Sequence, residues 1–236
     1  MKKYLLTSLL AVFAVSSANA AVGFDPYVTV RGGYDIQTNM SVDSFTMESI
    51  EWKDDQLKAV LGDQEWETSG FMVGGAVGAT FFTSDYFNAR AELEYIYNGL
   101  QTDDAEPTDD AEPLEIFNHT ALFNLAGDIK TGTPITPYVT AGIGYGWTNV
   151  SDGDVDLTGG TGMAWQVGAG IAYNVTDAFA IDLGYRYLNN GTINFENPFA
   201  DSGDPMLDTL FDNKEHSMDI AVDGSHQVYL GLRYTF

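Results

Sequence analysis

Three histidines are the side chains of this sequence best suited to acid–base catalysis, and one of them follows a serine. His226 comes directly after Ser225, a pair of residue types that can act as base and nucleophile. Both lie in a segment that alternates like a strand, where neighbouring side chains point to opposite faces, so the activating hydrogen bond cannot form. His119 falls on an apolar face, and His216 stands in a polar stretch without context. We therefore expect no catalytic residue and no enzyme activity.

Three aspartates at alternate positions, Asp152, Asp154 and Asp156, have the spacing that opens a calcium-binding loop. The residues that follow, Leu157 to Gly160, contain no glutamate to complete such a loop with a bidentate ligand. These aspartates are weak candidate ligands for a divalent cation shared with other acidic loops, and a solvated acidic surface is the favoured alternative. The sequence has no cysteine, which excludes disulfides and thiolate metal sites. No cofactor is expected.

Eight charged residues show a different pattern, because they share one phase within apolar segments. They are Arg31, Arg90, Arg186, Arg233, Glu92, Glu94, Asp128 and Asp182. In a closed barrel all eight would face the lumen, where an unpaired charge is costly and a paired one is tolerated. Four positive and four negative charges predict a neutral, hydrogen-bonded plug, since eight strands leave an interior that side chains can fill.

Segments that alternate in the period of a strand are the elements that position these charges. There are eight of them: Tyr27–Asp35, Phe71–Phe82, Phe87–Tyr97, Phe117–Ile129, Tyr138–Trp147, Trp165–Tyr173, Phe179–Tyr187 and Gln227–Phe236. Outward runs such as Val139 to Trp147 cover nine residues, enough for a tilted strand to cross the hydrocarbon core. Short turns alternate with long loops along the chain. The sequence therefore predicts an all-β fold, an eight-stranded antiparallel up-and-down transmembrane β-barrel.

Aromatic residues occur at both ends of the outward faces, where a barrel meets the two membrane interfaces. The belt predicted at the short turns contains Tyr27, Phe81, Phe87, Tyr173, Phe179, Tyr234 and Phe236. The belt predicted at the long loops contains Tyr34, Phe71, Tyr95, Tyr97, Phe117, Trp147, Trp165, Tyr185 and Tyr187. A soluble barrel, the alternative, would place most of its aromatic side chains inside.

Both ends of the chain indicate export. Lys2 and Lys3, the apolar run Leu5–Val15 and the small residues Ala18-Asn19-Ala20 predict a secretory signal over residues 1–20, followed by a barrel domain over residues 21–236. The last strand ends the chain. Its Gly231, Tyr234 and Phe236 resemble the carboxy-terminal signal by which outer-membrane barrel proteins are delivered to the barrel-assembly machinery.

Across nearly the whole mature chain, this pattern resembles the small eight-stranded outer-membrane proteins of the opacity-like surface antigen, outer-membrane protein X and outer-membrane protein A membrane-domain type. The resemblance implies a Gram-negative outer-membrane location, contact with lipopolysaccharide and the assembly machinery, and loops that meet host surfaces, other cells or ligands. A monomer is expected. Outer-membrane barrel enzymes carry a histidine with serine or acid partners near the outer rim, a pattern that this sequence does not complete.

The acidic residues gather in the predicted extracellular loops, which are the ranges 36–70, 98–115, 150–161 and 190–225. These loops hold 26 of the 34 Asp and Glu residues and only Lys53, Lys58 and Lys214 as basic residues. The second loop contains a tandem repeat, Thr102–Pro107 and Thr108–Pro113, too acidic and proline-rich to form a core. The net charge of −24, or −26 once Lys2 and Lys3 leave with the signal, argues against nucleic acid as a partner.

Three classes of function remain open from the sequence. A structural or adhesive surface barrel acting through acidic loops is favoured, a narrow cation-preferring channel is the alternative, and a lipid-modifying enzyme comes third. The sequence does not name the binding partner of the loops. It also leaves room for an extra hairpin in the first or last loop, where Ser49–Lys53 alternates weakly.

Overall fold

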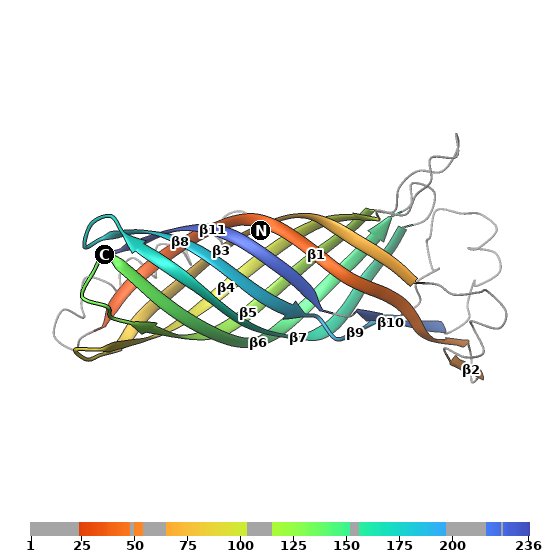
Figure 1. Ribbon diagram of the computed structural model, residues 1–236. Helices are drawn as coiled ribbons and strands as arrows, with labels where there is room; N and C mark the ends of the chain where they lie inside the picture. The colour runs from red at the N-terminus through yellow and green to blue at the C-terminus, as the bar shows by residue number, and fades with distance from the viewer. Residues whose placement is uncertain are drawn as a thin grey trace, which may run out of the picture.

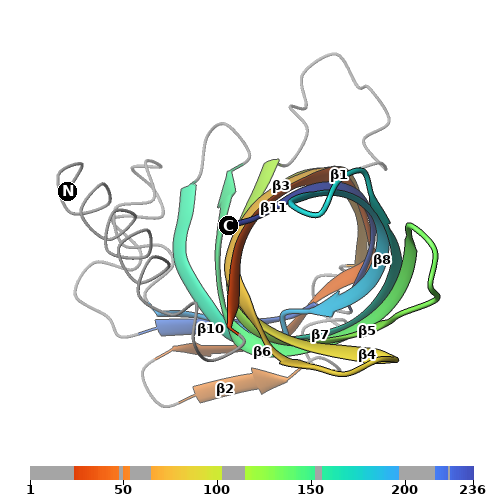
Figure 2. The ribbon, with the colours of Figure 1, turned by 90° about the vertical axis from the view of Figure 1, so that its left-hand side faces the viewer.

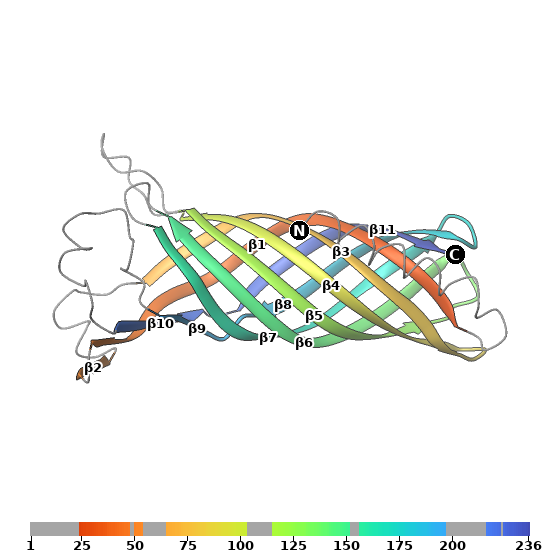
Figure 3. The ribbon, with the colours of Figure 1, turned by 180° about the vertical axis from the view of Figure 1, so that it is seen from behind.

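The structure is a computed structural model that describes residues 24–47, 50–53, 65–102, 115–151, 156–196, 216–222 and 224–236. Its wall is a closed antiparallel barrel (Figures 1 and 3). The eight strands of the wall are β1 (Asp25–Met47), β3 (Glu65–Thr83), β4 (Phe87–Thr102), β5 (Glu115–Ile129), β6 (Ile135–Ser151), β7 (Asp156–Asn174), β8 (Phe179–Asn189) and β11 (Ser225–Thr235). This architecture confirms the predicted fold. Among the described residues there is no helix long and apolar enough to span a membrane.

The barrel closes between its first and last strands, as Figure 2 shows from the short-turn end. β1 pairs with β11 from Tyr27 opposite Thr235 to Gln37 opposite Ser225. The final residue contributes as well, because the backbone N–H of Phe236 donates to the carbonyl of Pro26 over 3.0 Å. Closure satisfies the backbone groups that a strand edge would otherwise expose to lipid.

Three short turns join neighbouring strands at the same end of the barrel. In each turn a side-chain oxygen accepts a hydrogen bond from a backbone N–H. In the β3–β4 turn, Ser84 Oγ accepts from the N–H of Phe87 over 3.1 Å. In the β7–β8 turn, Thr176 Oγ1 accepts from the N–H of Phe179 over 3.0 Å. The β5–β6 turn uses Gly132 at a φ of 73°, a conformation that glycine adopts without strain.

At the loop end the wall continues beyond the predicted strands. The first loop was expected to begin at Ile36 and end at Gly70, but β1 runs on to Met47 and β3 already begins at Glu65. The last loop contains two further strands, β9 (Thr192–Glu196) and β10 (His216–Val222). β9 meets β7, and β10 pairs with both β9 and β1. At the loop end, beyond the part of the wall that crosses the membrane, β9 and β10 therefore take the places of β8 and β11. A further short strand, β2 (Ile50–Lys53), pairs with the end of β1.

The outward face is apolar and the inward face is polar over most of the wall. Exposed side chains such as Val30, Leu93, Ile143 and Leu230, each 60–65% exposed, form the outer band. One member of the predicted belts was placed wrongly. Tyr27 is only 2% exposed and points into the lumen, because it shares the phase of Thr29 and Arg31 and not that of Val28.

Candidate functional site

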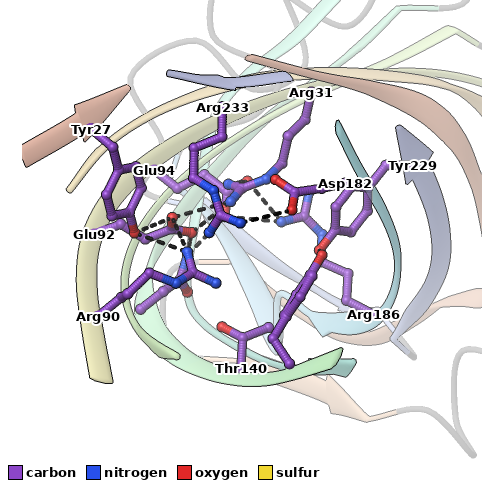
Figure 4. A network of polar contacts seen from close by, with 12 residues as sticks. Tyr27, Arg31, Arg90, Glu92, Glu94, Thr140, Asp182, Arg186, Tyr229 and Arg233 are labelled. Carbon is purple, nitrogen blue, oxygen red and sulfur yellow. Dashed lines mark hydrogen bonds and ion pairs between the residues drawn. The ribbon is translucent and has the colours of Figure 1, made fainter. Parts of the chain in front are cut away.

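The lumen contains a network of ion pairs centred on Glu94 of β4 (Figure 4). Its carboxylate lies 2.7 Å from Nη1 of Arg31 on β1 and 2.9 Å from Nη1 of Arg186 on β8. Asn124 of β5 donates to Glu94 over 2.8 Å and to Glu92 over 3.2 Å. Strands on opposite sides of the barrel are thus joined through one buried carboxylate.

A second group lies nearer the short turns. Arg90 of β4 donates to both carboxylate oxygens of Asp128 on β5, with Nε–Oδ2 and Nη2–Oδ1 distances of 2.8 Å. Tyr27 connects this pair to the first group, since it accepts from Arg90 over 3.2 Å and donates to Glu92 over 3.0 Å. Arg31 also pairs with Glu92 over 2.9 Å.

The remaining members complete the ion pairing. Arg233 of β11 lies 3.2 Å from Asp182 of β8. The structure therefore places all eight predicted lumen charges in ion pairs, with side chains no more than 9% exposed. Such pairs in a low-dielectric interior hold each other in place, and losing one partner leaves a buried charge unpaired.

The sequence analysis did not assign three inward tyrosines to the lumen. The guanidinium of Arg186 lies 5.1 Å from the ring centre of Tyr229, and that of Arg90 lies 5.4 and 5.5 Å from those of Tyr27 and Tyr138. These distances suit cation–π contacts. The signal for these residues was available, because each tyrosine shares the strand phase of the lumen charges.

Each of the three tyrosines covers a glycine directly opposite it on the neighbouring strand. Tyr27 faces Gly78, Tyr138 faces Gly170 and Tyr229 faces Gly184. A Cβ added to any of the three glycines would lie within 2.6 Å of the tyrosine ring. The inward glycines therefore provide the space in which the aromatic rings lie against the wall.

Asp35 changes the predicted charge balance of the lumen. This residue of β1 lies inside the span read as the first strand, in phase with Arg31, and is fully buried. Its Oδ2 accepts from Asn98 Nδ2 over 2.7 Å and from Gln227 Nε2 over 2.6 Å. The described lumen therefore contains five carboxylates and four guanidinium groups, and the predicted equality was wrong by one negative charge.

An apolar cluster packs in the lumen beside the charge network. It is formed by the buried side chains Met72, Ile96, Leu122, Ala164, Leu188 and Tyr229. Within the network, the space lined by Arg31, Glu94 and Arg186 is about 10 Å³, room for at most about one water molecule. A larger cavity of about 260 Å³, lined by residues that include Asp25, Lys130 and Arg233, lies at the short-turn end.

The predicted assembly-signal residues lie on both faces of β11. Tyr234 and Phe236 point outward, with their ring centres 5.3 Å apart in an edge-on contact. Gly231 faces inward, where an added Cβ would lie 3.3 Å from Cβ of Asp182 and 3.5 Å from Cγ of Arg31. Gly231 thus gives room to the lumen network, and the role of these residues in assembly stays a prediction.

The other predicted site residues lie partly outside the described residues. Asp152 and Asp154 are not described and Asp156 begins β7, so a divalent-cation site there stays a prediction. Residues 1–20, predicted as the signal, also lie outside the described ranges. Ser225 is buried on the inner face, whereas His226 accepts or donates at Nδ1 to Tyr185 on the outer face.

Comparison with known proteins places this barrel among outer-membrane proteins. An outer membrane protein of Gluconacetobacter diazotrophicus is 28% identical over the whole of this chain, which spans 64% of that relative's length. Outer membrane protein PagN of Salmonella typhimurium is 26% identical, with both chains covered in full.

Solved structures show similar barrels at low identity. Neisserial surface protein A is 18% identical with a TM-score of 0.48, over 91% of this chain and 97% of its own. The attachment invasion locus protein Ail of Yersinia pestis is 12% identical with a TM-score of 0.38, over 89% of this chain and 99% of its own. The sequence matches the outer membrane protein beta-barrel domain family over residues 7–236, so the chain belongs to this family and is a β-barrel protein of the Gram-negative outer membrane.

Proposed function

We propose that this protein is a non-enzymatic surface-contact protein whose barrel is a closed scaffold for acidic extracellular loops. The observation that carries the proposal is the filled lumen. Ion pairs tie β1, β4, β5, β8 and β11 together across the interior, and an apolar cluster packs beside them. In the part of the barrel that the structure describes, the network leaves a space of only about 10 Å³ between Arg31, Glu94 and Arg186, so we place the function in what the wall displays.

The chemistry of the loops favours a cationic partner. The four predicted loops hold 26 acidic residues against three lysines, and the wall strands β9 and β10 bring the last loop onto an extended rim. Opposite charges on two surfaces speed their encounter and select among partners. We therefore expect contact with basic patches on another cell or on host surface proteins, with a structural role in the envelope alongside it.

Adhesion of expressing cells tests the proposal. One variant lacks residues 102–113, and a matched variant keeps the length of the loop but carries Asn and Gln in place of its Asp and Glu. Both should express to the parent level and bind less well to epithelial monolayers and to polylysine-coated beads. Equal binding by the charge-neutral variant and the parent would refute a role for acidity, and equal binding by the deletion would refute contact through this loop.

A narrow cation-preferring channel is the second candidate, favoured by two observations. The lumen has one more carboxylate than guanidinium groups, and a cavity of about 260 Å³ opens at the short-turn end. Planar-bilayer recordings of refolded protein separate the two functions. We expect no stable openings, whereas reproducible cation-selective conductance would overturn the closed scaffold.

A further inference from the structure

The outer face carries the same three-residue unit twice, at the loop end of the membrane band. In the first unit, Tyr95 and Tyr97 of β4 hold His119 of β5. In the second, Tyr185 and Tyr187 of β8 hold His226 of β11. We call these the Tyr95–His119 unit and the Tyr185–His226 unit. Each consists of a Tyr-x-Tyr segment on one strand and a histidine opposite the second tyrosine on the next strand.

The two units match closely in geometry. The hydroxyl of the first tyrosine lies 2.6 Å from Nδ1 of the histidine in both. The ring of the second tyrosine lies 5.1 Å from His119 in one unit and 5.3 Å from His226 in the other, tilted by 54° and 61°. A hydrogen bond at Nδ1 sets the orientation of the imidazole and leaves Nε2 as the second hydrogen-bonding atom.

Both units lie at the same height in the wall. His119 is ten residues from Ile129 and His226 is ten residues from Phe236, and both of these reference residues are exposed at the short-turn end. Ten residues of a strand rising about 3.3 Å each and tilted by about 40° span about 25 Å, the height of the apolar band of a membrane barrel. The two histidines therefore lie where the hydrocarbon ends and the headgroups of the loop-side leaflet begin.

The units also lie on opposite sides of the barrel. Going around the wall, β6 and β7 separate them on one side, and β1 and β3 separate them on the other. In the described part of the eight wall strands, the outward side chains are mainly apolar or small, and these two histidines are the basic side chains among them. The two histidines therefore lie at one height on opposite sides of the barrel circumference.

We propose that the Tyr95–His119 and Tyr185–His226 units bind the phosphate groups of outer-leaflet lipid A. A phosphate offers acceptor oxygens and negative charge, and an imidazole N–H, especially when protonated, is a matching donor. The tyrosine rings beside each histidine have the amphipathic character that suits the headgroup level. The inference rests on the membrane location of the barrel and is independent of what the extracellular loops contact.

The test uses the full mature protein in nanodiscs that contain lipid A with both phosphates or lipid A with both removed. Histidine-labelled protein has only three histidine signals, so each can be followed separately by NMR. The signals of His119 and His226 should shift with the phosphorylated lipid, and that of His216 should not. Inorganic phosphate at the same concentration should leave them unchanged, because only a lipid places its phosphate at this height.

Variants then link the shifts to binding. Wild-type protein should retain phosphorylated over dephosphorylated lipid A by about fivefold per unit, the effect of one exposed charged contact. His119→Phe with His226→Phe keeps the aromatic rings and should abolish the preference, whereas the control His216→Phe should not. Tyr95→Phe with Tyr185→Phe should weaken it partly. Two results would overturn the proposal. One is an unchanged preference of the double histidine variant for phosphorylated lipid A, and the other is that the NMR signals of His119 and His226 in wild-type protein are the same with phosphorylated and dephosphorylated lipid A.

Discussion

Replacement of Glu94 by glutamine tests whether the lumen is held by mutual neutralisation of charges. The Glu94 side chain is 1% exposed, lies 2.7 Å from Nη1 of Arg31, and accepts from Arg186 over 2.9 Å and from Asn124 over 2.8 Å. Glu94→Gln keeps the shape but removes the charge and turns an amide N–H₂ toward these donors. Loss of one partner of a buried ion pair costs about 3–5 kcal/mol. Arg186 would then be left without its carboxylate.

Urea unfolding of the refolded protein in phospholipid vesicles measures this cost. With an m-value of about 2 kcal/mol/M, the midpoint of Glu94→Gln should fall by about 2 M. Removal of the opposing charge as well, in Glu94→Gln/Arg186→Gln, should bring the midpoint closer to that of the parent than either single substitution does. Such non-additivity is the mark of directly interacting residues.

The control is Asp177→Asn, which neutralises an exposed carboxylate in the β7–β8 turn and should leave the midpoint unchanged. Two results would refute the reasoning. One is a midpoint for Glu94→Gln within about 0.3 M of the parent, too small a shift for a buried charge left unpaired. The other is strict additivity of the two single substitutions, which would show that Glu94 and Arg186 do not stabilise the fold as a pair.

Three further perturbations follow from the same structure. Gly184→Ala places a Cβ 2.3 Å from the ring of Tyr229 and should cost about 1–3 kcal/mol in urea unfolding, whereas Gly32→Ala, which meets nothing within 4 Å, should not. Asp35→Asn retains an acceptor for Asn98 and Gln227 and removes the unbalanced charge. The urea midpoint of this variant should therefore equal or exceed that of the parent. A fall in midpoint as large as that of Glu94→Gln would show that Asp35 has a cationic partner. Phe195→Ala removes a fully buried ring from β9 and should make the loop end sensitive to protease while the barrel still shifts on a gel when boiled; Thr192→Ala, on the exposed side of the same strand, is the control.

The membrane part of the wall could be predicted because its information is local. A period of two within one strand assigns every side chain to lipid or lumen, whatever the neighbouring strands do. The strand ends could not be predicted in the same way. Residues 36–47 carry no strong alternation of apolar and polar side chains. β1 nevertheless continues through them because β3 and then β2 pair with it along one side, and β11 and then β10 along the other. Pairing of this kind depends on distant segments.

The lumen network was predictable in its members and not in its contacts. Phase alone assigned the eight charges to the interior. Which arginine meets which carboxylate depends on how the strands are staggered around the barrel, so the contact from Arg186 to Glu94, 92 residues apart, has no local signal. Tyr27 and Asp35 were missed although their phase was readable, the first because an aromatic at a strand end suggested the membrane interface.

In the part of the chain that the structure describes, the inward side chains change from charged to apolar where β9 and β10 replace β8 and β11 in the wall. This change affects how firmly the extracellular loops are anchored to the barrel. β8 ends at Asn189, whose side-chain oxygen accepts a hydrogen bond from the N–H of Gly191. Gly191 has a φ of 63°, and this backbone conformation turns the chain from β8 into β9. Beyond this point the inward side chains that the structure describes on β9 and β10 are Ile193, Phe195 and Met218, each at most 9% exposed.

Burial of these apolar side chains stabilises the part of the wall that contains β9 and β10, which lies outside the membrane. The loops that follow are therefore attached to a rim that is packed as well as hydrogen-bonded. A rim that is already ordered lowers the entropy cost of binding, since less of the contact surface must be fixed when a partner arrives. Loosening Phe195 should therefore weaken cell contact even where the acidic loops keep their charge. It should do so together with protease sensitivity of the loop end, which loss of loop charge alone would not produce.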